Sequence, residues 1–518
     1  MNSDDSKKVL RSWFTFKLRL IGEGMAVGLA AGAVVVLYRF LLEKALHFSK
    51  IAYLFQLQHP WFIPIWITLL VLGGLLTGWI VKKVPMISGS GIPQIKGVLQ
   101  HRLEMSWWRV ILGKLLGGVL GIGAGLSLGR EGPSIQLGAA VGQGYSRLFK
   151  KIKVEEGYLM TCGASAGLAA AFNAPISGVI FALEEIHKNF SPVVMISALA
   201  SSLAADFVSK NFFGMKPVFA FGAITPLPLK NYPAIVALGI VAGLLGIVFN
   251  KALYKSQDLY KRLSWLPTWV KPVLAFLTAG IAGLTLPAVL GGGHELVNEL
   301  MAEHFALFLL IILLLAKFLF TMISYGSSAP GGIFLPLLVV GALIGRIYWF
   351  LLSGWFGFND AYIGNFIILA MAGYFTAVVK APITGIILIT EMTGSFSNLL
   401  SLGVVCLTAY VVTDIFKSKP VYEELLERLL RSGGSELQGE EDKILLEIPV
   451  HSGSLLEGKR VREMKWPPAC LIVGVKRGES ELIPNGETIL CQGDCLIVLT
   501  NKEAAANVRE CLALAAAD

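Results

Sequence analysis

The chain alternates between long apolar runs and short interruptions that are polar or rich in Gly and Pro. Two apolar runs, near residues 21–44 and 61–84, are long enough for a helix to cross a bilayer, which takes about 20 residues. Between residues 86 and 417 many runs are shorter. The clusters that separate them are Ser88–Pro93, Gly129–Pro133, Asn173–Pro175, Ala329–Pro336 and Lys380–Pro382. Non-helical backbone is tolerated at membrane depth only beside protein or a wet cavity, so the pattern predicts an all-α polytopic membrane domain with discontinuous, tilted helices around a binding site.

Two of these breaks begin matching segments. Residues 173–184 read NAPISGVIFALE and residues 380–391 read KAPITGIILITE. A Gly-x-x-x-Pro break lies upstream of each segment, at Gly129 and at Gly332. Broken segments at corresponding places in two halves are typical of transporters built from repeats, which bind their substrate where the repeats meet. We therefore expect two inverted halves, about residues 21–215 and 232–430, within a transmembrane domain of residues 21–430.

Composition supports the membrane class. The chain has 518 residues, of which 55% are hydrophobic and 15% charged, and these values exclude a soluble globular protein. The net charge of +9 requires no nucleic-acid partner, because basic residues cluster beside the apolar runs, as in cytoplasmic loops that face anionic lipid. Residues 1–20 are polar and basic and lack the pattern of a cleaved signal peptide. We expect a multi-pass protein of the inner or plasma membrane with both termini in the cytoplasm.

The chain changes character after Arg431. We expect a linker at residues 431–442 and a small soluble α+β domain at residues 443–518. Its β-like runs are residues 444–450, 470–476 and 495–500, with a turn at residues 484–486 and a closing helix near residues 502–514. The six cysteines have no disulfide or zinc spacing, so we expect neither a metal nor a cofactor and take Cys491 and Cys495 as core residues.

The most unusual segment is Gly129-Arg130-Glu131-Gly132-Pro133, which puts two ionisable residues inside an apolar region. Ionisable residues at membrane depth are rare and mark ion or proton pathways. Glycine lets backbone N–H groups approach a ligand closely, and proline is favoured in the first turn of a helix. We hypothesise a helix whose positive N-terminal end faces an anion, with Glu131 at the position of that anion. The alternative is a wet loop at the membrane surface.

Two other breaks can direct backbone donors at the same anion: GSGIP at residues 89–93 and GIFLP at residues 332–336. Each helix end contributes about half a charge, which holds an anion weakly enough for its release. Ser90 adds a neutral hydroxyl donor. Tyr422, just after the last apolar run, is a candidate for a second hydroxyl, and an interfacial belt tyrosine is the alternative.

These motifs, followed by Lys-Pro-Val-Tyr at residues 419–422, resemble the CLC chloride channel and transporter family over about residues 15–430. The resemblance implies a homodimer with a separate pathway in each subunit. It assigns the gate of the outer anion site to Glu131, and electrostatic support to Lys114. The residues that it assigns to chloride offer hydroxyl groups or backbone amides: Ser90, Arg130, Gly132, Ile333, Phe334 and Tyr422.

A second carboxylate decides between exchanger and channel. Glu185 matches the position that receives protons from the cytoplasm in CLC exchangers, and we include its neighbour Glu184 in the candidate proton group. The residues alone fit a helix-end salt bridge with Lys188 equally well. A carboxylate and chloride that compete for one site couple the two fluxes, so we expect a proton-coupled chloride antiporter. A passive chloride channel gated by voltage or pH is the alternative.

Other functions fit the sequence less well. Residues 163–167, Gly-Ala-Ser-Ala-Gly, match the Gly-x-Ser-x-Gly elbow of hydrolases, but that elbow needs a preceding strand and a His/Asp pair. Small residues that pack helices explain the match better, so we expect no enzyme. Residues from about 440 resemble the C-terminal lobe of RCK domains, which regulate transporters by binding small ligands or by dimerising. Both roles stay open for this chain.

Overall fold

The structure, a computed structural model, describes residues 3–188, 190–219, 221, 225–302, 305–432, 443–451, 453–467, 470–478, 480–501 and 504–517. It divides into two compact units, residues 1–427 (the membrane unit) and residues 428–518 (the C-terminal unit). Of the linker predicted at residues 431–442, residues 433–442 lie outside the described part of the chain.

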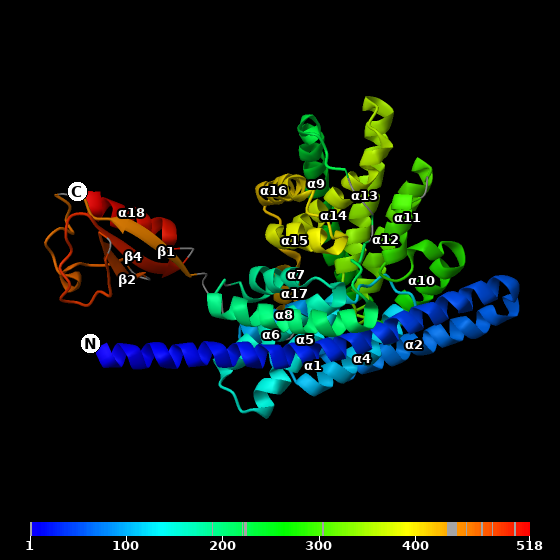
Figure 1. Cartoon of the computed structure of the whole chain (residues 1–518), viewed down its shortest axis with the longest axis horizontal. Helices are drawn as coiled ribbons and strands as arrows, with labels where there is room; N and C mark the ends of the chain where they lie inside the picture. The colour runs from blue at the N-terminus through cyan, green and yellow to red at the C-terminus, as the bar shows by residue number, and fades with distance from the viewer. Residues whose placement is uncertain are drawn as a thin grey trace. The chain divides into compact units, whose positions relative to one another are not determined.

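The membrane unit is helical, and within its described residues seven helical segments are long and apolar enough to cross a membrane (Figure 1). Its α-helices are α1 (Ser3–Gln58), α2 (Ile63–Lys83), α3 (Ile92–Leu99), α4 (Trp107–Gly123), α5 (Glu131–Leu148), α6 (Lys153–Phe172), α7 (Pro175–Phe181), α8 (Pro192–Phe213), α9 (Tyr232–Arg262), α10 (Pro272–Thr285), α11 (His294–Ala302), α12 (Leu307–Gly326), α13 (Phe334–Phe356), α14 (Ile363–Val379), α15 (Pro382–Thr393), α16 (Leu399–Ile415) and α17 (Val421–Ser432). A π-helical turn, η3 (Ala182–His187), follows α7, and short 3-10 turns occupy residues 60–62, 85–87, 229–231, 287–289 and 360–362. The first helix is much longer than the run predicted at residues 21–44, because no Gly/Pro cluster interrupts the chain before Pro60.

Helices begin at every predicted break, which confirms the discontinuous architecture. Helix α3 begins at Ile92 directly after Gly91, whose φ of 90° is left-handed, and α7 and α15 begin at prolines. Before these two prolines, Asn173 and Lys380 end α6 and α14 in the left-handed conformation, with φ of 53° and 62°. The same device therefore interrupts the chain at the same place in each half, since a left-handed residue stops a helix and the proline starts the next one.

The two halves are joined by a reciprocal pair of carboxylates. Glu184 in the first half accepts hydrogen bonds from the backbone N–H groups of Ile383 (3.2 Å) and Thr384 (2.7 Å) at the start of α15. Glu391 in the second half accepts them from Ile176 (3.1 Å) and Ser177 (2.7 Å) at the start of α7. Each half thus caps the equivalent helix of the other, as a two-fold relation between inverted repeats requires.

The C-terminal unit is a four-stranded antiparallel sheet with one covering helix. Its strands β1 (Lys443–Pro449), β2 (Cys470–Arg477), β3 (Ser480–Leu482) and β4 (Asp494–Asn501) lie in the order β1-β4-β2-β3. A 3-10 turn at residues 461–463 lies between β1 and β2, and α18 (Ala505–Ala517) follows β4. Alternate residues of β4 are buried, and Leu496 and Val498 pack with Val508 and Leu512 of α18. The short strand β3 was not predicted. The prediction for Cys491 was wrong: it is exposed in the turn before β4, whereas Cys495 is half-buried.

An ion pair between the half-exposed Arg477 and the buried Asp494 fixes that turn, and its pH dependence can be tested. The Arg477 guanidinium donates to both carboxylate oxygens of Asp494 (2.8 and 2.7 Å), which also accepts from the Cys491 N–H group (2.8 Å). These bonds hold the pKa of Asp494 below its ordinary value of 3.8. A carboxyl whose pKa is lower in the folded than in the unfolded chain stabilises the fold at pH values above its ordinary pKa. This contribution is lost as the pH falls through the lowered pKa of the folded state.

We expect Asp494→Asn to destabilise the C-terminal unit by about 1–3 kcal/mol at pH 7. The difference in stability from the wild type should shrink as the pH falls below 3.8 and through the lowered pKa of Asp494, where the native carboxyl becomes protonated. Hydrogen-exchange protection of β2 and β4 peptides in the full chain measures both effects. Glu447→Gln, which removes an exposed pair with Lys476, is the matched control and should leave protection unchanged. Equal protection in Asp494→Asn and wild type at pH 7 would contradict this account.

Candidate functional site

The three Gly-rich motifs meet in the middle of the membrane unit. Gly129 donates its N–H to the Gly332 carbonyl (2.6 Å), and Gly332 donates back to the Gly129 carbonyl (2.8 Å). Gly331 donates to the carbonyl of Gly89 (2.9 Å), which brings in the first motif. Segments far apart in sequence are thus tied directly to one another, and the starts of α3, α5 and α13 converge.

Glycine is required where the first and second motifs touch. A Cβ atom at Gly132 would lie 2.9 Å from both the Cβ and the carbonyl oxygen of Ser90, closer than side chains normally pack. The N-caps of α3, α5 and α13 are Gly91, Arg130 and Ile333, and none of these three residues makes a side-chain cap hydrogen bond. The first-turn N–H groups of α5 and α13 therefore have no side chain from their own cap to satisfy them, which leaves them available to an anion. In α3 the first N–H group, that of Ile92, bonds to the Ser90 hydroxyl.

Glu131 lies at the start of α5 and is fully buried, so the alternative of a wet surface loop was wrong. Among the described residues neither of its carboxylate oxygens has a hydrogen-bond partner of full geometry. The nearest backbone donors are the N–H groups of Glu131 itself and of Leu335, the second residue of α13. The carboxylate therefore occupies the space that the N-terminal ends of two helices share.

The side chain of Arg130 points to a cavity beside this space. Its guanidinium donates to Glu43 (3.1 Å), which also pairs with Arg39 (3.0 Å). The cavity has a volume of about 420 Å³ and is lined by these three residues together with His294 and Leu335. Leu335 lines this cavity and is also beside Glu131, so the cavity lies close to the buried carboxylate.

On the other side of the junction lie two hydroxyl groups and a set of aromatic rings. Ser90 is buried, and its Oγ accepts a hydrogen bond from the Ile92 N–H group (3.3 Å). Tyr422 is fully buried, and its hydroxyl has no partner among the residues described, which contradicts the interfacial belt alternative. Its ring packs edge-on against Phe181 (6.4 Å between centroids), and Phe181 packs in turn against Phe334 (5.9 Å).

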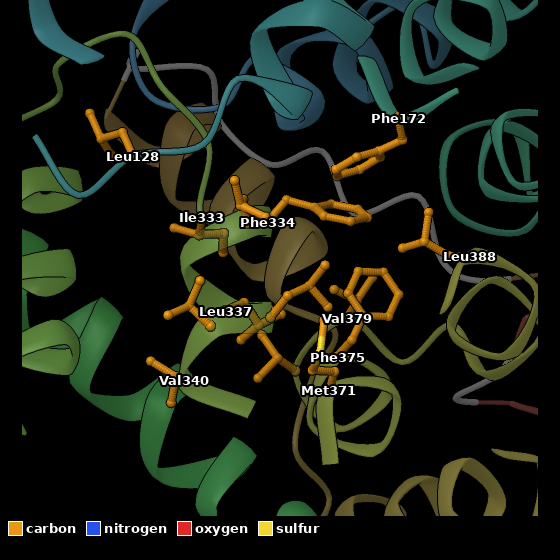
Figure 2. Packing of buried hydrophobic residues seen from close by; sticks show 14 of the residues in the cluster. Leu128, Phe172, Ile333, Phe334, Leu337, Val340, Met371, Phe375, Val379 and Leu388 are labelled. Atoms are coloured by element: carbon orange, nitrogen blue, oxygen red, sulfur yellow. The ribbon is translucent and has the colours of Figure 1, made fainter. Parts of the chain in front are cut away.

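Phe334, the first residue of α13, is held by rings from several helices. Its centroid lies 5.4 Å from Phe172 of α6 and 4.7 Å from Phe375 of α14 (Figure 2). Ile333 and Phe334 are both fully buried. The ring packing fixes the start of α13, and so the direction of its free N–H groups.

Lys114 is fully buried in α4, and its ammonium group donates to the carbonyls of Ile87 (2.9 Å) and Gly89 (2.7 Å). It thus holds the loop that carries Ser90. Sequence reasoning missed its counterpart in the second half, Lys317, which donates in the same way to Val289 (2.9 Å) and Gly291 (2.6 Å). A comparison of the two repeats for charged residues at equivalent positions would identify Lys317 from the sequence.

The two adjacent glutamates have separate environments. Glu185 is buried in η3 and accepts a hydrogen bond from Lys96 (2.7 Å), while Lys188 lies 3.5 Å from its second oxygen, so the salt bridge considered from sequence is present. Glu184 instead caps α15. Lys96 was missed, although it is in α3, only six positions after Ser90, and is a charged residue in an apolar stretch.

Ser165 does not have the surroundings of a hydrolase nucleophile. It lies buried in the interior of α6 rather than after a strand, and its hydroxyl bonds with that of Ser202. This contact joins α6 to α8, which agrees with the role of small residues in close helix packing.

The fold and the site define a polytopic ion-transport protein with two inverted halves and anion-facing helix ends. The sequence profile of the voltage gated chloride channel family matches residues 73–414, and that of the TrkA-C domain matches residues 445–513. The chain therefore belongs to the CLC family, and its C-terminal unit is a TrkA-C domain, the C-terminal lobe of RCK proteins. Both resemblances drawn from the motifs are confirmed.

Similar proteins share most of the chain. The H(+)/Cl(-) exchange transporter ClcA of Cronobacter sakazakii is 34% identical over 429 residues, which cover 80% of this chain and 91% of the relative. ClcA of Klebsiella pneumoniae is 32% identical and covers 79% and 89%. Among solved structures, a slow cyanobacterial Cl-/H+ antiporter has a TM-score of 0.76 and 31% identity over 80% of this chain and 98% of its own. A CLC-type fluoride/proton antiporter, with a TM-score of 0.64, 24% identity and coverage of 77% and 96%, shows likeness in fold alone.

The contact between the first two motifs predicts a large effect of a single methyl group. We expect Gly132→Ala to lower anion flux at least about tenfold, because the new Cβ would separate Ser90 from the start of α5, and displacements of this size disturb preorganised sites strongly. Flux from reconstituted vesicles measures it. Gly354→Ala in α13 is the matched control, since no described heavy atom lies within 4 Å of its Cβ position. Equal flux in the two variants would contradict the contact.

The positions of the adjacent glutamates predict different effects. Glu184→Ala removes the cap of α15, so we expect a loss of about 1–2 kcal/mol of stability with an unchanged ratio of proton to anion flux. Glu391→Ala, which removes the equivalent cap of α7, should behave in the same way. Thermal unfolding in detergent and paired flux measurements test this. A Glu184→Ala protein of native stability without proton flux would restore Glu184 to the proton group.

Proposed function

We propose that this protein is a proton-coupled chloride antiporter. The observation that carries the proposal is the position of Glu131: a fully buried carboxylate that has no hydrogen-bond partner among the described residues and lies at the N-terminal ends of α5 and α13. A fixed carboxylate and a free chloride have the same charge and seek the same donors. They therefore compete for one place, and protonation of Glu131 removes the competitor.

The coupling follows from that competition. Ionised Glu131 occupies the outer anion position, where the N–H groups of Arg130 and Gly132 also serve chloride. Chloride that enters from the central position displaces the carboxylate, and the displaced side chain takes up a proton. Return of the neutral side chain and release of its proton toward the other face reset the site. Each chloride that moves in one direction thus favours a proton that moves in the other.

The central anion position lies between Ser90, Tyr422 and the start of α13. The buried Tyr422 hydroxyl has no partner in the described part of the chain, which supports this assignment. Buried polar groups are normally hydrogen-bonded, and an anion would satisfy this one. The N–H groups of Ile333 and Phe334 complete it, and Lys114 both orients the Ser90 loop and adds positive potential. Neutral donors supply most of the binding, so the ion is held weakly enough to leave.

Glu185 is the proton acceptor on the cytoplasmic side in this proposal. It is buried, unlike a surface carboxylate, and its neighbours Lys188 and Glu423 are half-exposed and link it to solvent. The relatives and the structure that are more than 30% identical are named as exchangers, which supports exchange over a passive channel. The CLC family match also motivates the proposal of a homodimer in the plasma membrane with cytoplasmic termini, and the TrkA-C match motivates a C-terminal unit that dimerises or binds a small ligand.

Purified protein in vesicles with an outward chloride gradient should pump protons inward against a pH gradient. We expect Glu131→Gln to keep chloride flux and lose proton movement entirely, because a neutral amide neither competes as an anion nor carries a proton. Glu131→Asp, which keeps the acid on a shorter side chain, serves as the control and should retain proton movement at a lower rate. Chloride flux in the wild type without any proton movement would establish the channel alternative, and proton coupling that survives in Glu131→Gln would defeat the mechanism.

A further inference from the structure

Two buried and two half-exposed charges form a cluster between α3, η3 and α17. Lys96 of α3 donates to Glu185 of η3 (2.7 Å), and both side chains are only 1% exposed. Glu423 of α17 lies 3.8 Å from Lys96 and 2.9 Å from Lys188. Two lysines and two glutamates thus form one closed network, and its net charge is zero when all four are ionised. We call these four residues the inner cluster.

The four residues of the inner cluster differ sharply in solvent exposure. The side chains of Glu423 and Lys188 are 41% and 42% exposed, so water compensates their charges. Lys96 and Glu185 have no such access. An unpaired charge in a protein interior is strongly destabilising, whereas a hydrogen-bonded pair is tolerated. Lys96 is therefore what allows Glu185 to be ionised at its buried position.

Among the described residues, few other groups near Glu185 can compensate the charge of its carboxylate. From α17 the cluster receives Glu423 and the neutral phenol of Tyr422, and η3 itself contributes Lys188 and His187. His187 is turned toward α6, where it bonds with Thr161 and lies beside Tyr158. Lys188 is 3.5 Å from Glu185 and half-exposed, so Lys96 is the one fully buried cation in contact with this carboxylate among the residues described.

Lys96 is also connected to the anion position through a single short helix. Helix α3 begins at Ile92, whose N–H group bonds to the Ser90 hydroxyl, and Lys96 follows four residues later. Four residues of α-helix span about 6 Å. A change in the electrostatic balance at Lys96 therefore acts over a short distance on any anion beside Ser90.

We propose that Lys96 is a positioning residue that couples proton uptake at Glu185 to anion binding beside Ser90. The inference rests on the proposed antiport. When Glu185 is ionised, Lys96 is neutralised by it and holds it in place. When Glu185 takes up a proton, the inner cluster gains one net positive charge, and that charge attracts chloride to the central position. Proton loading and chloride loading then favour each other on the same face of the membrane.

The proton half of the proposal is tested with Lys96→Met, which keeps the length of the side chain and removes its charge. Without the counter-charge the Glu185 carboxylate holds its proton to higher pH. We expect the pH at which proton flux is half-maximal to rise by at least one unit, and the infrared carboxyl band that Glu185→Gln removes to persist to correspondingly higher pH. Lys96→Arg should restore the wild-type profile because it keeps the charge.

Lys188→Met is the matched comparison, because it removes the same charge from the same carboxylate at a half-exposed place. The shift in the pH of half-maximal proton flux should be clearly smaller in Lys188→Met than in Lys96→Met. An equal shift in the two variants would mean a general loss of positive charge and would overturn the role of Lys96. If Lys96→Met fails to fold, the double variant Lys96→Met/Glu185→Gln, which leaves no charge unpaired, should recover folding. Chloride binding should be weaker in this double variant than in Glu185→Gln, which keeps the Lys96 charge, and equal binding in the two would overturn the anion half of the proposal.

The anion half is measured directly by calorimetric chloride titration in the Glu131→Gln background, where the gate no longer titrates. Affinity should rise on the order of tenfold as Glu185 becomes protonated, as for unit charges roughly 10 Å apart at an effective dielectric constant near 20. In Lys96→Met this rise should move to higher pH together with the protonation of Glu185, and Lys96→Arg should keep it at the wild-type pH. A rise that stays at the wild-type pH in Lys96→Met would overturn the proposal. The antiport itself fails separately, if wild-type vesicles move no protons at all.

Discussion

The structure depends on backbone N–H groups that end inside the membrane unit without a partner from their own helix. A helix that starts at membrane depth leaves its first N–H groups unsatisfied, and lipid cannot satisfy them. Here three such starts, of α3, α5 and α13, are drawn together by backbone bonds between Gly89, Gly129 and their counterparts in the third motif. The unsatisfied N–H groups that make a broken helix unfavourable are therefore the same groups that can bind an anion.

The repeat supplies stabilising contacts in pairs. Lys114 and Lys317 each clamp two backbone carbonyls in the loop before a broken segment, and Glu184 and Glu391 each cap a helix of the opposite half. These contacts need no ligand and define the frame of the site. They also separate structural charges from functional ones: a buried charge with a complete set of partners belongs to the frame, whereas Glu131 lacks such a set.

The carboxylates of the membrane unit show how partners decide chemistry. Glu184 and Glu185 are neighbours in sequence, yet one binds helix N–H groups and the other binds a buried ammonium group. The π-helical turn at residues 182–187 and its left-handed end at Lys188 send the two side chains to different neighbours. A helix cap fixes its carboxylate in place, while a paired carboxylate beside half-exposed charges can exchange protons with solvent.

The sequence by itself determined the class of protein, the broken helices, the repeat and the family, because apolar length, Gly/Pro punctuation and motif order are local properties of the chain. It also singled out Ser90, Glu131 and Tyr422, since polar groups in apolar runs stand out without coordinates. Only the tertiary structure decided which charge meets which. The contacts of Lys96, Lys317 and Glu184 join residues that are 89, 28 and 200 positions apart, and hydrophobic patterning predicts that a residue is buried but not which residue it contacts.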